Sequence, residues 1–348
     1  MITKINIKNY KSIERAELEL SRINVLIGPN GSGKSSVLEC IEYFKQAFEF
    51  IRLGTGTDNG MVWSGSIGVS IPFKYIVFQQ DVNRKINVEL TFRGILIDGS
   101  SEDQVYGKLL IEPEIMNIQL FTGDNERPKK ILVFVLRADR KVTRVLDGVI
   151  TNVYEINIAN AHQLFYYTCY RSEFKENVQI VRDFYAKYGL HDVRWVPTTD
   201  GQYEIIATTD EGIDVNLADV GSGLNALFPI VVALAFYPKN STIFIEHPEM
   251  HLHPKLQYEL AEFFLNVLER RNYQLVLETH SEHLLYGLLN AVARKKLKPK
   301  DLTIYSVRKE QGKSVFEKLK IYEDGSVEGN LQDFLEADID AFLDFLKA

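Results

Sequence analysis

The chain has 348 residues, 45% of them hydrophobic and 11% aromatic, and carries a formal net charge of −7. This is ample for a large core, and the acidic balance disfavours nucleic-acid binding by the chain as a whole while leaving a local basic face open. The two cysteines, Cys40 and Cys169, exclude a disulfide framework and fit a reducing cytosol. The N-terminus is strand-like rather than a signal peptide, and no apolar run approaches the roughly 20 residues that cross a bilayer, so we expect a cytoplasmic protein without a membrane partner.

The first 27 residues predict three strands. Residues 2–8 and 16–20 alternate apolar and polar side chains, with a turn around 9–12, which is typical of a hairpin. The continuous apolar run at 23–27 then predicts a buried strand.

A glycine-rich motif follows that strand, Gly28-Pro-Asn-Gly-Ser-Gly-Lys-Ser35, and leads into a helical pattern. Its spacing is that of a phosphate-binding loop, and strand, loop and helix form the context that such a loop requires. The alternative, a chance glycine-rich turn, is disfavoured because every fixed position and both flanks are present.

The residue types in this loop explain its chemistry. Glycines let the backbone turn its N–H groups toward phosphate oxygens, and the helix that begins near Lys34 adds the positive end of its dipole. Lys34 can reach the β- and γ-phosphates, and the Ser35 hydroxyl can ligate Mg²⁺. We therefore expect ATP and Mg²⁺ as cofactors. The expected phosphate contacts are Asn30, Gly31, Ser32, Gly33, Lys34, Ser35 and Ser36.

The middle of the chain predicts a β-rich lobe and then helices. After a Gly- and Ser-rich loop at 54–72 come five β-like runs, at 73–78, 86–92, 108–111, 115–121 and 131–136. Residues 155–189 are helical in pattern and rich in aromatic side chains. Such a stripe is more often packing than a platform for stacking bases, so we favour packing.

The last third predicts alternating strands and helices. Strands at 193–217 lead to a helix at 224–237, a buried strand at 242–245, an amphipathic helix at 255–271, a strand at 274–277 and a helix at 282–296. Two strands, 302–307 and 315–321, precede a C-terminal helix. This alternation predicts a mostly parallel sheet.

Polar residues end two of these strands. The strand at 242–245 ends in Glu246, as does the strand with which a phosphate-loop enzyme holds Mg²⁺, so Glu246 joins Ser35 as a candidate metal ligand. The strand at 274–277 ends in the cluster Glu278-Thr-His-Ser281. Upstream, Gly221, Ser222 and Gly223 stand at the start of a helix.

The order of these motifs resembles an ABC-type ATPase head, and in particular the AAA-like ABC ATPases related to RecF, SMC and OLD-family proteins. The motifs that carry the resemblance are Ile7–Ser12, Val220–Ile230, Glu246–Pro254 and Glu278–His283. The resemblance implies an α/β P-loop NTPase fold: a mostly parallel core sheet, an N-terminal antiparallel β lobe and a mixed β and helical insertion. We expect one head with its nucleotide-binding core at 1–55 and 193–325, the insertion at 60–190 and a C-terminal helix at 326–348.

The resemblance also implies roles for individual residues. Glu246 would hold Mg²⁺, and His280 would be the switch histidine that senses the γ-phosphate. Gly221–Gly223 would contact the γ-phosphate bound to a partner subunit, because such heads enclose two nucleotides between two protomers. Residues 251–254 would link the two sites.

The chain departs from that family pattern in three places. His247 occupies the position of the catalytic glutamate, and an imidazole is a weaker, more pH-dependent base than a carboxylate. Glu249, two residues on, is the candidate substitute. Gly221 stands where the signature serine is usual, and only Gln79 and Gln80 are candidates for a glutamine loop. We therefore expect ATP binding with slow or partner-stimulated hydrolysis.

Three further clusters have a functional and an ordinary interpretation. The histidines at 247, 251, 253, 280 and 283 match no zinc spacing well, so a structural metal is disfavoured. The acidic residues at 336–344 fit the solvated face of an amphipathic helix better than a nuclease site. The basic segment Arg294–Lys300 could contact DNA or RNA phosphates, but cations are also common at helix C-termini.

These observations favour an ATP-driven switch in which two heads dimerise and control a separate effector such as a nuclease, in the manner of prokaryotic anti-phage modules. The chain ends before the TOPRIM nuclease domain that OLD-type proteins append, which is why the effector is expected to be a partner. The alternative is a RecF-like ATP-dependent DNA-binding protein. A membrane-transport ATPase subunit is disfavoured by the RecF-like opening and by the Glu-His-Pro-Glu run at 246–249.

Overall fold

A computed structural model of the chain describes residues 1–50, 57–58, 62–68, 76–93, 104–112, 115–121, 132–136, 138, 161–199 and 202–329. The acidic residues at 336–344 therefore lie outside the described residues. Of the C-terminal helix expected at 326–348, only residues 326–329 are described.

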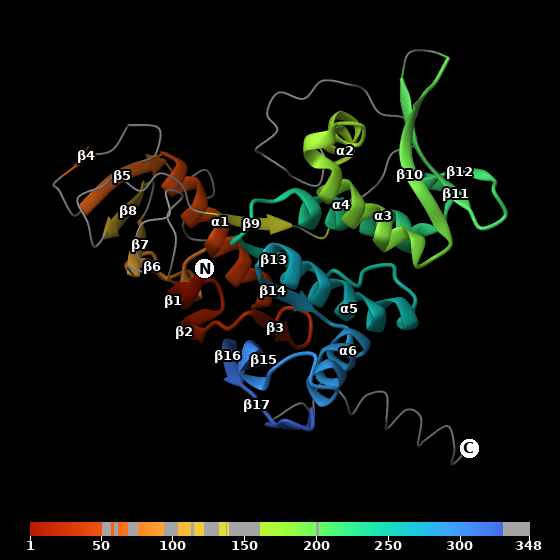
Figure 1. Cartoon of the computed structure of the whole chain (residues 1–348). Coiled ribbons are helices and arrows are strands. Elements are labelled where there is room, and N and C mark those ends of the chain that lie inside the picture. The colour runs from red at the N-terminus through yellow and green to blue at the C-terminus, as the bar shows by residue number, and fades with distance from the viewer. Residues whose placement is uncertain are drawn as a thin grey trace.

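The centre of the molecule is a six-stranded sheet in the order β16-β15-β3-β14-β13-β9 (Figure 1). Its strands are β3 (Ile23–Ile27), β9 (Val133–Leu136), β13 (Thr242–Glu246), β14 (Gln274–Thr279), β15 (Leu302–Glu310) and β16 (Lys313–Lys318). Neighbouring strands pair in parallel from β15 through β3, β14 and β13 to β9, and only β16 is antiparallel to its neighbour β15. The expected mostly parallel sheet is confirmed.

One strand of the central sheet differs from the expectation. The sequence places residues 131–136 in the β-rich lobe, but β9 pairs in parallel with β13 in the central sheet. The reason is its environment: three of its four hydrophobic residues are buried, as in parallel strands covered on both faces. Position along the chain suggested the wrong sheet.

The second large sheet has seven strands in the order β2-β1-β6-β7-β8-β5-β4, and all its pairings are antiparallel. Its strands are β1 (Ile2–Tyr10), β2 (Ile13–Glu19), β4 (Thr57–Asp58), β5 (Val62–Gly68), β6 (Ile86–Arg93), β7 (Gln104–Glu112) and β8 (Ile115–Phe121). The expected N-terminal hairpin and antiparallel lobe are confirmed. The loop expected at 54–72 is wrong where the structure describes it, because β4 and β5 lie in this range and β5 pairs with β8.

The strand expected at 73–78 is wrong where the structure describes it. Val77 forms only an isolated bridge with Tyr10, and a short 3-10 helix, η3 (Phe78–Gln80), follows. Gln79 and Gln80 have φ values of 54° and 57°, a left-handed conformation that ends an extended chain.

Two hydrophobic layers cover the central sheet. Val25 and Leu277 face helices α2 to α6, whereas Leu26 and Val276 face the layer that contains α1 (Lys34–Phe50) and the antiparallel sheet. The helices on the first face are α2 (Ala161–Thr168), α3 (Lys175–Ala186), α4 (Ser222–Phe236), α5 (Pro254–Arg271) and α6 (Glu282–Ala293). Helix α1 therefore lies between the two sheets, directly after the glycine-rich loop.

The smaller elements complete the described chain. A three-stranded sheet projects beside α2 and α3 (Figure 1). These elements are β10 (Leu190–Pro197), β11 (Tyr203–Thr209), β12 (Asp214–Asn216), β17 (Lys320–Ile321), β18 (Val327–Glu328) and the 3-10 helices η5 (Ser172–Phe174), η6 (Leu217–Asp219) and η7 (Pro299–Asp301). The aromatic residues Phe165, Phe184 and Tyr185 are buried in the helical layer, which confirms that they pack.

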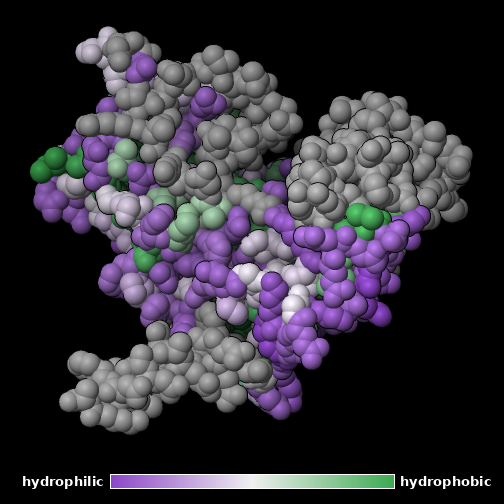
Figure 2. All heavy atoms as spheres, turned by 180° about the vertical axis from the view of Figure 1, so that it is seen from behind, coloured by the Kyte–Doolittle hydropathy of each residue, from purple (hydrophilic) through white to green (hydrophobic). Residues whose placement is uncertain are grey.

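The described surface is predominantly hydrophilic in the view from behind, with hydrophobic residues in small separate patches (Figure 2). No helix among the described residues is long and apolar enough to span a bilayer.

Candidate nucleotide site

The glycine-rich loop lies between β3 and α1 and is packed against β15 and β16. Gly28 has a φ of +151°, and a Cβ placed there would collide with the Val307 carbonyl. Gly33 has a φ of +112°, and a Cβ there would collide with the Ser314 side chain. At both positions the backbone conformation and the close neighbour require glycine.

Lys34 is 3% exposed and points back into this loop. Its Nζ donates to the carbonyl oxygens of Gly28 at 2.9 Å and Pro29 at 3.0 Å. Burial lowers the pKa of Lys34 to about 8, although the charges of Glu278 and Glu249 work against that change. Phosphate oxygens are stronger, charged acceptors for such an ammonium group than carbonyls are.

The strand order decides which carboxylate meets the loop. Strand β14 lies between β3 and β13, and its Glu278 is in register with Leu26 on one side and Glu246 on the other. The Ser35 hydroxyl donates to Glu278 Oε1 at 2.5 Å. Glu246, one strand further away, accepts the N–H of Ala138 at 3.0 Å. The carboxylate beside the loop serine is thus Glu278, to which we assigned no role from the sequence.

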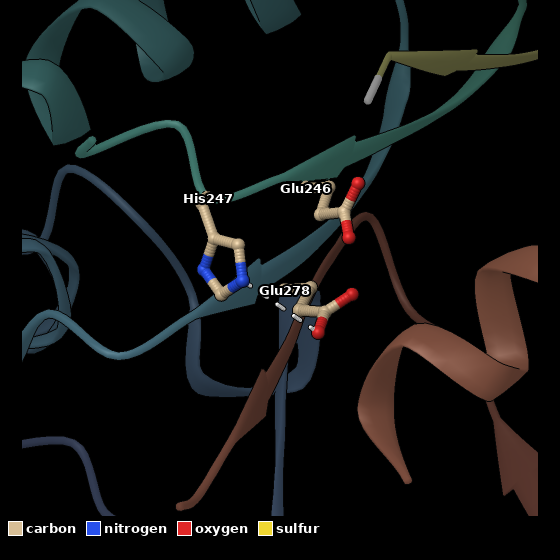
Figure 3. A group of neighbouring side chains, drawn as sticks. All are labelled: Glu246, His247 and Glu278. Carbon is tan, nitrogen blue, oxygen red and sulfur yellow. Dashed lines mark ion pairs between the residues drawn. The ribbon is translucent and has the colours of Figure 1, made fainter. Parts of the chain in front are cut away.

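Glu246, His247 and Glu278 form one cluster at the ends of β13 and β14 (Figure 3), with one ligand atom from each within 4.8 Å of the others. Glu278 is 1% exposed, and its Oε2 has no hydrogen-bond partner among the residues that the structure describes. Burial raises the pKa of Glu278; the hydrogen bond from Ser35 opposes this rise and the Glu246 charge adds to it. An orphaned carboxylate oxygen beside further oxygen donors fits a divalent cation, so Ser35, Glu278 and Glu246 are residues that could hold Mg²⁺.

His280 packs on the histidine of this cluster. The His247 and His280 rings stack with centroids 4.9 Å apart and planes 17° apart. His247 Nδ1 lies 3.5 Å from Glu249 Oε1, and its Nε2 lies 4.0 Å from Glu278 Oε1. The hydrogen bond with Glu249 raises the pKa of His247, whereas burial lowers the pKa of His280 to about 4, with the charges of Lys34 and His247 contributing.

Glu249 is turned into the protein. It is 8% exposed, and its Oε1 accepts the backbone N–H of His280 at 2.9 Å. Burial alone would raise the pKa of Glu249, but the contacts with His247 and His280 outweigh it and hold the pKa low. The carboxylate thus contacts the His247 ring and the His280 backbone, and it does not itself line the cavity.

The cavity over the loop has a volume of about 440 Å³, in the range of small-molecule sites. The expected residues that line it are Asn30, Gly31, Gly33, Lys34, Ser35, Ser36, His247 and His280. Four more lining residues were missed by the sequence analysis, besides Glu278: Lys11, Ser12, Glu39 and Lys309. Lys11 Nζ lies 2.5 Å from Glu39 Oε2, which also accepts from the Tyr10 hydroxyl at 2.8 Å. The motif at 7–12 was the signal for Lys11 and Ser12.

Other expected site residues lie apart from this cavity. Gly221 and Ser222 are exposed at the start of α4, and Gly223 packs on the 251–252 loop, where a Cβ would lie 3.1 Å from the His251 oxygen. Ser32, Glu246 and Glu249 do not line the cavity; Ser32 and Glu249 are buried, and Glu246 is half-buried. Gln79 and Gln80 are exposed.

The remaining histidines do not join the cluster. His253 caps α5 through Nδ1, which accepts the Lys255 N–H at 3.3 Å, and His251 and His283 are exposed.

Sequence comparisons match two parts of the chain. A family model described as "AAA ATPase domain" matches residues 1–113, and one described as "AAA domain, putative AbiEii toxin, Type IV TA system" matches residues 170–285. The DNA double-strand break repair Rad50 ATPase of Archaeoglobus fulgidus is 27% identical over 158 residues, which are 42% of this chain and 17% of that protein. The DNA replication and repair protein RecF of Yersinia enterocolitica is 56% identical over 56 residues, or 16% of either chain. The matches thus span about a sixth of these relatives' length.

Solved structures share the fold. An SMC head bound to the C-winged helix domain of ScpA has a TM-score of 0.60 at 17% identity, covering 92% of this chain and 98% of that one. An SMC head with an extended coiled coil, bound to the C-terminal domain of ScpA derived from Pyrococcus furiosus, has a TM-score of 0.54 at 13% identity, covering 99% of each chain. The expected α/β ATPase-head fold is confirmed.

Proposed function

We propose that this chain, an AAA-type ABC ATPase head of the RecF and SMC-like group, is an ATP-operated switch. Two heads would close around two molecules of ATP, and closure would control a partner effector. The observation that carries the proposal is the connected arrangement of the phosphate loop, Lys34 and the hydrogen bond from Ser35 to Glu278 beneath one cavity. Mg²⁺ held by Ser35 and by the carboxylates of Glu278 and Glu246 would neutralise part of the phosphate charge.

Hydrolysis of ATP to ADP and phosphate should be slow in the isolated protein. Glu249 is buried and engaged with His280, so it is poorly placed to activate a water molecule. His247 lines the cavity, but Glu249 raises its pKa, which increases the protonated fraction that cannot accept a proton. His280, whose pKa is near 4, stays neutral at pH 7 and can sense a phosphate as a hydrogen-bond donor.

The first experiment measures ATP binding and phosphate release at high protein concentration in wild type, Lys34→Ala and the control Lys8→Ala, a substitution at an exposed strand position. We expect binding and slow turnover in wild type and in the control, and neither in Lys34→Ala. Binding that survives Lys34→Ala would contradict the site, and many turnovers per second in wild type would contradict the slow switch.

Dimerisation is supported by the exposure of Gly221 and Ser222 on the surface of α4, away from the chain's own cavity. Residue Gly223 packs on the 251–252 loop, so a change at one site has a direct contact through which to reach the other. Light scattering with ATP should show a dimer for wild type and a monomer for Ser222→Arg. A Ser222→Arg protein that still dimerises would place the interface elsewhere.

A role in prokaryotic anti-phage defence is supported by the family match at 170–285, whose description names a putative toxin of a type IV TA system. The effector would be a separate protein such as a nuclease. Copurification from the native host should recover it with the wild type and in smaller amount with Lys34→Ala. Recovery of no partner in either case would count against effector control.

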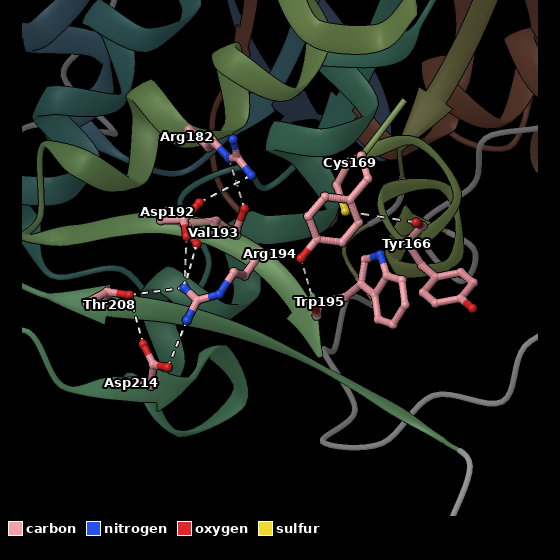
Figure 4. Close-up of polar contacts among 10 residues, drawn as sticks. Tyr166, Cys169, Arg182, Asp192, Val193, Arg194, Trp195, Thr208 and Asp214 are labelled. Atoms are coloured by element: carbon pink, nitrogen blue, oxygen red, sulfur yellow. Dashed lines mark hydrogen bonds and ion pairs between the residues drawn. The ribbon is translucent and has the colours of Figure 1, made fainter. Parts of the chain in front are cut away.

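The second candidate, a DNA-maintenance function, is favoured by the basic segment Arg294–Lys300. Its five cations are exposed, and none of them forms an ion pair with a residue that the structure describes. By contrast, Arg194 pairs with Asp192 and Asp214 (Figure 4), and Lys4, Arg270 and Arg308 are also paired. DNA binding through it should fall steeply with salt, and replacing Lys296 and Lys298 by Ala should reduce the slope by about 2. An unchanged slope would remove this candidate.

A further inference from the structure

The ends of β13 and β14 carry a nitrogen donor among the oxygen donors of the cation site. We infer that His247 and Glu278 are both cation ligands, so that the nucleotide's cation is bound by a mixed nitrogen and oxygen set that prefers Mn²⁺ to Mg²⁺. This inference rests on the proposed ATP binding and specifies the metal chemistry of that site.

The first observation is the state of Glu278. This side chain is 1% exposed, and within the described part of the chain its Oε2 has no hydrogen-bond partner, which is costly for a buried carboxylate oxygen. Its other oxygen accepts from Ser35, and the carboxylate is turned toward the same space as that of Glu246 (Figure 3). A divalent cation would provide the missing partner.

The second observation is the orientation of His247. Its Nδ1 faces Glu249 at 3.5 Å, and its Nε2 faces Glu278 at 4.0 Å. When a carboxylate accepts the N–H of one ring nitrogen, the lone pair of the other nitrogen is available to a metal, as in carboxylate–histidine–metal arrangements. Glu249 is itself fixed by the His280 N–H at 2.9 Å, so it is a positioning residue for His247.

The backbone holds His247 in this orientation. Its φ is +44°, an uncommon left-handed conformation for a residue with a side chain. The conformation is fixed at both sides, because the His247 N–H donates to the Glu278 carbonyl at 2.8 Å and the His247 carbonyl accepts from Met250 at 3.1 Å. Strained backbone of this kind is concentrated at functional sites.

The spacing suits one ion. Two ligand atoms bound at about 2.1 Å lie no more than about 4.2 Å apart, and the three residues of the cluster each offer a ligand atom within 4.8 Å of the others. A side-chain shift of under about 1 Å therefore closes the set. Mg²⁺ favours oxygen ligands alone, whereas imidazole suits transition metals, and affinity rises from Mn²⁺ along the series.

The competing arrangement is an imidazolium at His247 that balances the neighbouring carboxylates by itself. It would leave no lone pair for a cation. The two arrangements differ in one observable, which is whether a protein nitrogen is bonded to the bound metal.

The test uses the full chain labelled with ¹⁵N, unlabelled AMP-PNP and Mn²⁺, with pulsed electron paramagnetic resonance to detect nitrogen bonded to the manganese. We expect a ¹⁵N coupling in wild type and in the control His283→Gln, whose histidine is exposed on α6, and none in His247→Gln. Absence of the coupling in wild type, or its persistence in His247→Gln, would overturn the inference. Mn²⁺ alone, at higher concentration, should give the same coupling.

Affinity provides a second readout that does not depend on turnover. Glu249→Gln should weaken Mn²⁺ binding about 10- to 100-fold by releasing the His247 ring. His247→Glu, which gives an all-oxygen set, should keep cation binding and reduce the ratio of Mn²⁺ to Mg²⁺ affinity; an unchanged ratio would argue against a nitrogen ligand. Nucleotide binding in EDTA, measured separately, tests the proposed function, so either proposal can fail without the other.

Discussion

The two halves of the nucleotide site differ in how they are built. The phosphate-binding half is a continuous segment, Gly28–Ser36, which carries its own glycines, leads into α1 and packs closely on β15 and β16. The acidic half comes from the ends of β13 and β14, and Glu246 and Glu278 are adjacent only because those strands pair in register. A local motif positions its atoms through backbone conformation, whereas an assembled one depends on the sheet, so the two halves should respond differently to substitution.

The largest expected effect is at Gly28. Alanine there would collide with the Val307 carbonyl at a φ of +151°, and we expect ATP affinity to fall by about 100-fold, or about 3 kcal/mol. Gly212→Ala is the control, because Gly212 has a φ of +78°, no described atom within 4 Å of its Cβ position and a place between β11 and β12, outside the cavity lining. Isothermal titration should show little loss in the control, and equal losses would mean that the effect of Gly28→Ala does not arise in the phosphate loop.

The acidic half should respond next. Glu278→Gln removes the charged acceptor of the Ser35 hydroxyl, which is worth about 1.5–3 kcal/mol and predicts a loss of cation-dependent ATP affinity of about 10- to 100-fold. Glu246→Gln should cost less, since Glu246 is bonded to Ala138. Titrations with and without divalent cation measure the difference. A larger loss in Glu246→Gln would return the principal role to Glu246.

The phosphate-binding half should also carry a pH dependence. Because burial lowers the pKa of Lys34 to about 8, its ammonium group loses its proton at a pH at which ATP binding can be measured. ATP affinity should weaken as the pH rises through 8, by up to about tenfold per pH unit. Lys34→Arg keeps the charge and should move the weakening out of this range. Wild-type ATP affinity that stays constant to pH 10 would show that the pKa of Lys34 is not lowered.

The smallest effect on ATP affinity is expected at Lys11, at the edge of the cavity. Lys11 pairs with Glu39 beside the cavity and is partly exposed, so its contribution is expected to be below about 1 kcal/mol. Lys11→Ala should weaken ATP binding about two- to fivefold, and the loss should shrink in high salt. Lys8→Ala, at an exposed position of β1 outside the cavity lining, should have no effect. A loss as large as that of Glu278→Gln would make Lys11 a principal phosphate ligand.

Much of the fold could be predicted from periodicity. The hairpin at 2–20 and the alternation after residue 224 have strong patterns, and both are present. Errors arose where the hydrophobic pattern of a strand does not indicate which strand it pairs with. Val133–Leu136 has the pattern of any short strand, but it pairs with β13. The run before Phe78 is apolar, yet the left-handed Gln79 and Gln80 end it as a turn.

For the site, the sequence by itself identified the phosphate-binding half, because residues 28–36 are neighbours in the chain and their spacing is the motif. It also identified His247 and His280, which line the cavity, whereas the roles of Glu246, Gly221, Ser222 and Gly223 stay predictions. Only the tertiary structure decided which carboxylate meets Ser35. Strand β14 is inserted between β3 and β13, and that order, which no local pattern records, places Glu278 against the loop and Glu246 one strand away.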